Sequence, residues 1–155
     1  VTSVSYSPDQ KLRAYADAHE IRVLDADSFR YIQTLRGLPQ DLEGADSQSY
    51  RHGVGDNMVF LDEDRIASSG MGGLVTIWDV HSGRRLTSIE APPGKEFASS
   101  IDYSPASNRL VIGTSAGRLL LTTLEDDHIA PLVPLATLGG YMWELQFRRD
   151  GRYVA

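Results

Sequence analysis

Histidines, acidic clusters and serines are the residues of this sequence that could do chemistry. The four histidines are His19, His52, His81 and His128, and no two of them lie at a spacing typical of metal ligands. We expect all four in turns or loops, as ordinary surface histidines. The sequence has no cysteine, which excludes thiolate metal sites, disulfides and cysteine nucleophiles.

Three consecutive carboxylates, Asp62, Glu63 and Asp64, are of the type that binds calcium or magnesium. The alternating oxygen ligands and the turn glycine of a calcium loop are missing around them, so we expect solvated turn residues. Serine and histidine occur without the G-x-S-x-G elbow of many hydrolases. The sequence therefore predicts no catalytic residues, no metal site and no cofactor.

Composition and charge narrow the class of protein. The chain has 155 residues, 41% of them hydrophobic and 23% charged, which is enough for one domain with its own core. Its net charge of −6 opposes non-specific binding to nucleic acid or to anionic lipid. No run of eighteen apolar residues occurs, so we expect no membrane insertion.

A repeated pattern of strands is the main structural signal. Four segments can be aligned so that each predicted strand ends in an aromatic residue followed by a polar turn. The aromatic residues are Tyr6, Phe60, Tyr103 and Phe147, separated by steps of 54, 43 and 44 residues. The longer first step is explained by an insertion between Gly37 and Gly53.

A second, third and fourth strand are predicted after each of the first three turns. The fourth strands are YIQTL, RLTSI and PLVPLATL, the last interrupted by Pro134. Four short antiparallel strands joined by tight turns make one blade of an all-β propeller. A generic antiparallel sandwich is the alternative, but it does not explain a twelve-residue offset that second and third strands share in three units. The offset relates Leu12 to Leu24, Ile66 to Trp78, and Leu110 to Thr122.

The stretch IASSGMGGLVTIWDV, which ends a third strand with Trp78-Asp79, resembles the WD-repeat (WD40-like) β-propeller family. The resemblance extends over nearly all of the chain, although the other units match by spacing and pattern alone and are degenerate. It implies about three and a half blades and an intracellular, cytoplasmic protein. The expected organisation is a blade at 1–36, an inserted loop at 37–53, blades at 54–91 and 92–138, and the first two strands of a further blade at 139–155.

The resemblance also implies structural repeat residues. Blades of this family are often tied together by a hydrogen-bonded tetrad, for which this chain offers Ser68, Trp78 and His52, while Gly72 stands where the family has Asp. Asp79 closes the third strand of the best repeat, and in the first unit the counterpart of Trp78-Asp79 is Leu24 followed by Asp25. The tetrad is incomplete in every unit, so we expect the blades to depend more on apolar packing.

Propellers close with roughly four to eight blades, so we expect the remaining blades of a longer chain to complete the ring. Assembly of several copies into one ring is the less favoured alternative, because the sequence stops within a blade. A non-enzymatic scaffold that presents its loops to a protein or peptide partner is the expected function. The alternative is a small-ligand-binding or catalytic propeller with its site at the central channel.

The insertion GLPQDLEGADSQSYRHG is the first candidate for partner binding. It joins a fourth strand to the next first strand, which in the family lies on the narrower face of the ring. Acidic residues beside a Tyr-Arg pair suit a basic peptide, since Tyr and Arg often anchor interfaces. A spacer without a binding role is the alternative. The candidate residues are Asp41, Glu43, Asp46, Tyr50 and Arg51.

Trp143 is the second candidate for partner binding. It lies four residues before Phe147, at a position that the resemblance places near the mouth of the central channel. Packing between blades is an equally good interpretation. A catalytic propeller would need acidic or histidine residues at this position in several units. The four units have Thr2, Asp56, Ser99 and Trp143, so only one carboxylate occurs, and we favour the scaffold.

Overall fold

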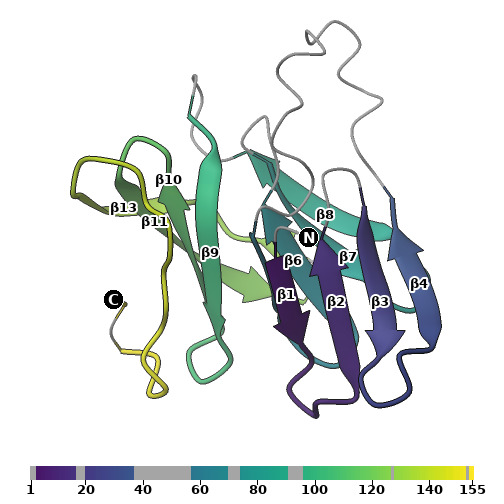
Figure 1. Ribbon diagram of the computed structural model, residues 1–155. Helices are drawn as coiled ribbons and strands as arrows, with labels where there is room; N and C mark the ends of the chain where they lie inside the picture. The colour runs from purple at the N-terminus through teal and green to yellow at the C-terminus, as the bar shows by residue number, and fades with distance from the viewer. Residues whose placement is uncertain are drawn as a thin grey trace, which may run out of the picture.

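The computed structural model describes residues 3–16, 20–36, 57–69, 74–90, 96–126, 128–152 and 154–155, and all regular structure among them is β-strand (Figure 1). The first sheet has the order β1 (Ser3–Tyr6), β2 (Leu12–Ala16), β3 (Ile21–Asp25), β4 (Tyr31–Leu35). The second has the order β5 (Asn57–Phe60), β6 (Arg65–Ser69), β7 (Leu74–Asp79), β8 (Arg85–Glu90). The third contains β9 (Ala98–Ser104), β10 (Arg109–Thr114), β11 (Arg118–Glu125) and β13 (Val133–Thr137) in that order, with β12 (His128–Ile129) beside the end of β11. The prediction of three consecutive four-stranded antiparallel units is confirmed.

The pattern of apolar and polar residues in each strand matches the number of sheet faces that are covered. Strand β7 reads LVTIWD, and four consecutive residues of it are buried, because the β5–β8 sheet is covered on both faces. In β3, by contrast, Ile21 and Val23 are fully buried while Arg22 between them is exposed, the alternation of a strand with one covered face. Pro134 lies in β13, an edge strand, where the missing N–H interrupts no ladder to a further described strand.

The core consists of two layers between successive sheets. One layer lies between the first and second sheets and includes Val23, Phe60 and Trp78. The other lies between the second and third sheets and includes Ile77 and Leu110. Trp78 and Ile77 are neighbours in β7 and point to opposite faces, so one strand contributes to both layers.

The first strands of successive sheets are neighbours, since β5 contacts both β1 and β9. The backbone N–H of Phe60 donates to Ser5 Oγ at 3.3 Å, which joins β5 to β1. The side-chain amide of Asn57 donates to the carbonyl of Ser99, which joins β5 to β9. Sheets stacked face to face around adjacent first strands are the arrangement of a propeller.

Residues 139–155 continue this arrangement beyond the third sheet. Ser99 Oγ donates to the carbonyl of Met142 at 2.7 Å, and the N–H of Phe147 donates to Asp102 Oδ2 at 2.5 Å. An isolated antiparallel bridge joins Phe147 to Val154, the same seven-residue offset that joins Tyr6 to Arg13 in β1 and β2. Among the described residues of 139–155 this bridge is the only β-pairing, so the two predicted strands and the blade boundaries stay predictions.

Strand register corrects the alignment of the first unit. The partner of Phe60 in β6 is Ile66, the partner of Ile66 in β7 is Trp78, and Tyr103 and Leu110 pair in the same way. In the first sheet Tyr6 pairs with Arg13, so Arg13 and not Leu12 corresponds to Ile66. The prediction was wrong because it followed apolar residues, and Leu12 faces the second sheet instead.

A second correction concerns His128, which was expected in a turn or loop. It lies in the short strand β12, opposite Glu125 in β11. Strand β11 is the longest described strand, with eight residues, and its last two residues, Leu124 and Glu125, pair with β12. His81 does lie in a turn, while His19 and His52 are outside the described residues.

Candidate interaction surface

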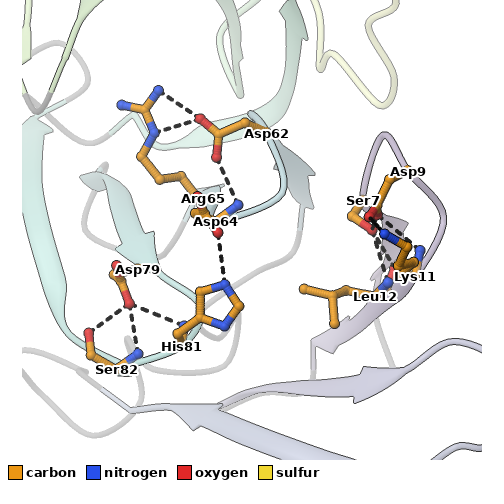
Figure 2. Close-up of polar contacts among 10 residues, drawn as sticks. All are labelled: Ser7, Asp9, Lys11, Leu12, Asp62, Asp64, Arg65, Asp79, His81 and Ser82. Atoms are coloured by element: carbon orange, nitrogen blue, oxygen red, sulfur yellow. Dashed lines mark hydrogen bonds and ion pairs between the residues drawn. The ribbon is translucent and has the colours of Figure 1, made fainter.

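The sheets have two ends. At one, which we call the turn end, β1 connects to β2 and β3 to β4, as do their counterparts in the other sheets. At the other, the loop end, β4, β8 and β13 end and the following first strands begin (Figure 1). Polar contacts at the turn end hold the turns themselves, as Figure 2 shows.

Asp79 of the Trp-Asp pair closes the turn between β7 and β8. Its Oδ1 accepts hydrogen bonds from the N–H of Ser82 at 2.7 Å, the hydroxyl of Ser82 at 2.8 Å and the N–H of His81 at 3.1 Å (Figure 2). These bonds, above all that from the Ser82 N–H, lower the pKa of Asp79. Asp25 makes the same contacts with Ser28, and its pKa is lowered chiefly by the Ser28 hydroxyl. Both carboxylates therefore stabilise their turns by accepting hydrogen bonds from the backbone and from a serine hydroxyl.

The carboxylates of Asp62 and Asp64 also make contacts with other residues of the turn end. Asp62 Oδ2 forms an ion pair with Arg65 at 2.8 Å, and Asp64 Oδ1 contacts His81 Nε2 at 2.8 Å (Figure 2). In the part of the chain that the structure describes, no three His, Asp or Glu residues are grouped as a metal site would need. Asp62 therefore stabilises its own turn, and Asp64 joins that turn to the one between β7 and β8.

Two members of the predicted tetrad meet in the core. The indole Nε1 of Trp78 donates to Ser68 Oγ at 2.9 Å, and both side chains are at most 2% exposed. His52 and Gly72 lie outside the described residues. The bond ties β6 to β7 within one sheet, which is a structural role.

The inserted loop also lies outside the described residues. Asp41, Glu43, Asp46, Tyr50 and Arg51 all belong to it. The loop connects β4, which ends at the loop end, to β5, which begins there.

Trp143 lies at the loop end and is 80% exposed, so it does not pack between the described sheets. Its ring is 4.5 Å from that of Tyr141, tilted by 42°, and the Tyr141 ring meets that of Phe97 edge-on at 5.9 Å. We call Phe97, Tyr141 and Trp143 the aromatic row. Sequence reasoning singled out Trp143 alone, although a signal for the others was present. Phe97 and Tyr141 each precede the aromatic residue that ends the next first strand by six positions.

Tight backbone geometry holds the aromatic row in place. The N–H of Leu138 donates to the carbonyl of Gly117 at 2.8 Å, which brings the chain before Tyr141 against the turn between β10 and β11. Gly117 has a φ of +76°, and a Cβ there would lie 2.6 Å from the carbonyl carbon of Gly139. The N–H of Phe97 donates to Ser115 Oγ in the same turn. Glycine at 117 thus permits a close approach that a side chain would prevent.

The row has apolar and charged neighbours. Leu138, on the same connection, is 72% exposed, and Glu144 directly follows Trp143 and is exposed. Glu96, next to Phe97, pairs with Arg118 at 2.9 Å, and this bond lowers the pKa of Glu96. Exposed aromatic rings in contact offer flat apolar faces to a partner, and their quadrupoles attract cations.

A hollow of about 280 Å³ is lined by Gln146, Phe147, Arg148, Val154 and Ala155. None of these described lining residues has a carboxylate or imidazole side chain. Asp102 contacts the lining residue Phe147, since its Oδ2 accepts a hydrogen bond from the Phe147 N–H. Burial raises the pKa of Asp102.

Comparison with solved structures finds the beta-propeller domain of Cps50 (Swd1) from Myceliophteria thermophila, with a TM-score of 0.71 and 16% sequence identity. The match covers 99% of this chain and 46% of that one, so the chain spans about half the length of the propeller domain. No protein-family model and no curated protein matches. In the described part of the chain no helix is long and apolar enough to cross a membrane. The likeness shows the fold: the three sheets are consecutive propeller blades.

Proposed function

We propose that this chain, which has the fold of part of a WD-repeat β-propeller, serves as a non-enzymatic scaffold that binds a protein or peptide partner at its loop end. Further blades of a longer chain complete the ring in this proposal. Loops on a rigid scaffold are where binding residues concentrate, and a propeller end gathers several of them. The fold alone does not specify a partner, so the proposal rests on the surface.

The aromatic row is the observation that carries the proposal. Exposed aromatic side chains that lie together are typical of interaction sites, and Trp and Tyr are enriched among residues that dominate binding energy. Trp143 projects furthest, at 80% exposure, while Tyr141 at 40% supports its ring. An anchored ring of this kind loses little side-chain freedom on binding.

The inserted loop gives the partner its expected chemistry. In this proposal Asp41, Glu43 and Asp46, which belong to the connection between β4 and β5, supply negative charge to the binding surface. Glu144 adds a carboxylate beside Trp143. A peptide with Lys or Arg next to an apolar residue would meet carboxylates and aromatic faces together.

The catalytic or small-ligand propeller has weaker support. Ser99, at one of the inward positions, donates its hydroxyl to backbone carbonyls of Met142 and Gly113 and is 3% exposed. Thr2 and Asp56 lie outside the described residues. No described group at these positions is both ionisable and free.

Peptide binding to the intact protein tests the proposal. A defined peptide library supplies the strongest binder, whose Kd is then measured by fluorescence anisotropy for three variants. We expect Trp143→Ala to weaken binding about 30-fold, since interface aromatic anchors contribute about 2 kcal/mol. Deletion of 41–48 should weaken binding to basic peptides and leave the melting temperature nearly unchanged. Val133→Ala, which shortens another exposed apolar side chain (55%), is the control and should bind normally. Unchanged binding in both test variants would remove the loop end as the binding site.

A further inference from the structure

Each described sheet has a face that corresponds to the Trp78 face of the second sheet. There, Phe60, Ile66 and Trp78 are directly paired across β5, β6 and β7, and they are at most 5% exposed because the first sheet covers them. In the third sheet, Tyr103 and Leu110 occupy the same positions and pack against the second sheet. Residues at these positions thus form sheet-to-sheet contacts in two successive interfaces.

The same positions in the first sheet form an exposed face. Register places Tyr6, Arg13 and Leu24 there. Tyr6 is 52% exposed and Val4, two residues earlier in β1, is 47% exposed. We call this the outer face, formed by Val4, Tyr6, Arg13, Tyr15 and Leu24.

Arg13 is the exception on the outer face, because only 6% of it is exposed. Its guanidinium carbon lies 3.2 Å from the centre of the Phe29 ring and 5.1 Å from that of Tyr15. Its Nε and Nη2 are buried and have no hydrogen-bond partner in the structure. Phe29 itself is 61% exposed and has a φ of 60°, which is unusual for a bulky residue. Two aromatic rings therefore contact a cation in which two of the three nitrogens, Nε and Nη2, lack acceptors.

A charge in a layer between sheets requires an opposite charge. The counterparts of Arg13 are Ile66 and Leu110, both fully buried between sheets. A guanidinium at such a position is strongly disfavoured unless an acceptor, preferably a carboxylate, meets its planar edge. Because the Phe29 and Tyr15 rings lie against the guanidinium of Arg13, an acceptor has to approach along the edge of the guanidinium plane.

We propose that the blade which completes the ring at the outer face places a carboxylate against Nε and Nη2 of Arg13. The occupant is a blade of the same ring, since the outer face matches, position by position, two faces that are covered by a blade here. The match to a propeller domain about twice as long leaves chain for such a blade. This inference rests on the proposed completion of the ring by further blades.

Thiol labelling tests whether the outer face is covered. Residues 1–155 contain no cysteine, so single cysteines can be introduced there in the intact protein after any cysteine of the further blades has been replaced by serine. Tyr6→Cys reports on the outer face, and Lys11→Cys in the neighbouring exposed turn, where the lysine side chain is 79% exposed, is the control. We expect maleimide to react at least tenfold more slowly at position 6 than at position 11. Equal rates would overturn the proposal, and so would protection that disappears on dilution, since the occupant would then be a second copy.

The pH dependence of stability tests the carboxylate. In the intact protein, Arg13→Met keeps an apolar stem but leaves the partner carboxylate buried and unpaired, so it should lower the urea midpoint at pH 7. A carboxylate paired with Arg13 has a lowered pKa in the folded state, so the stabilisation it gives is present at pH 7 and is lost as pH falls. The deficit of Arg13→Met should therefore shrink at least by half by about pH 4. Arg13→Lys should show a smaller deficit with the same trend.

Charged groups already around Arg13 do not produce this trend. Tyr6 and Tyr15 are the ionisable neighbours of Arg13 on the outer face, and neither is a carboxylate. Arg22 pairs with Tyr15 in the sheet, and the carboxylate beside it, Glu20, is paired with both Arg22 and Arg36. Asp9 and Asp25, in the two adjoining turns, accept hydrogen bonds within those turns. The bond from the Lys11 N–H lowers the pKa of Asp9 to about 2, below the window of the test. An equal deficit at both pH values would overturn the carboxylate pairing. Peptide binding at Trp143, measured on the same variants, should be unchanged, which separates this test from that of the proposed function.

Discussion

Replacing Ser68 with alanine is the sharpest test of how the central blade is held together. Ser68 Oγ is the acceptor of the Trp78 indole N–H at 2.9 Å, in a place where both side chains are at most 2% exposed. The substitution removes the acceptor and leaves the N–H buried, beyond the reach of water. An unsatisfied buried donor costs about 1–3 kcal/mol, a large fraction of the roughly 5–15 kcal/mol that stabilises a typical domain.

Urea unfolding, followed by far-UV circular dichroism, measures this cost. With a slope of about 2 kcal/mol per M, a loss of about 2 kcal/mol lowers the midpoint by about 1 M. Trp78→Phe removes the donor as well, so Ser68→Ala should cost much less in that background. The double-mutant cycle should then give a coupling energy of about 1 kcal/mol.

Ser100→Ala is the matched control. Ser100 is as buried as Ser68, at 1% exposed, but its hydroxyl has no hydrogen-bond partner. Its removal should leave stability unchanged or raise it slightly. If Ser68→Ala costs no more than Ser100→Ala, the Ser68–Trp78 bond does not stabilise the blade and the reasoning is wrong.

Two further predictions concern the third sheet. Gly117→Ala should lower the free energy of unfolding in urea by about 1 kcal/mol or more, because φ is +76° and the new Cβ would lie 2.6 Å from Gly139. Gly139→Ala is the control, since its φ is +74° but nothing lies within 4 Å of the new Cβ, and it should cost less. Equal costs would show that the close approach at Gly117 does not matter. Burial raises the pKa of Asp102, so the folded protein binds this proton more tightly than the unfolded chain and the stabilisation is lost as pH rises through the raised pKa. The stability of the natural protein relative to Asp102→Asn should accordingly decrease from about pH 3 to pH 7 in thermal unfolding, and an increase would mean that a charge partner stabilises the carboxylate.

Sequence predicted the architecture because two periodic signals agree. The alternation of apolar residues marked the strands, and the recurrence of Tyr6, Phe60 and Tyr103 marked the units. Both signals come from packing that recurs in every blade. They are therefore present in all three units, although only the second unit has a Trp-Asp pair, Trp78-Asp79. Asp79 and Asp25 were recognised as equivalent, and both cap the same turn.

The misplaced pairing of Leu12 shows where such signals fail. Alignment by apolar residues assumes that equivalent faces are covered alike, but the outer face of the first sheet carries Arg13 where the other sheets carry Ile66 and Leu110. The recurrence of Phe97 and Tyr141 six residues before Tyr103 and Phe147 can be read from the sequence. The contact between their rings cannot, because the two residues come from different units and meet only through the stacking of neighbouring sheets. Strand β12 depends on the length of β11, which no local pattern in HI reveals.

Nuclear Overhauser contacts between side chains test the central claim, that three sheets stack in chain order around adjacent first strands. The Trp78 ring should show contacts to methyl groups of the first sheet, such as those of Ala14 and Val23, and Ile77 should show contacts to methyl groups of Leu110 or Ile112 in the third. Contacts from Trp78 and Ile77 to one and the same neighbouring sheet would contradict the propeller arrangement.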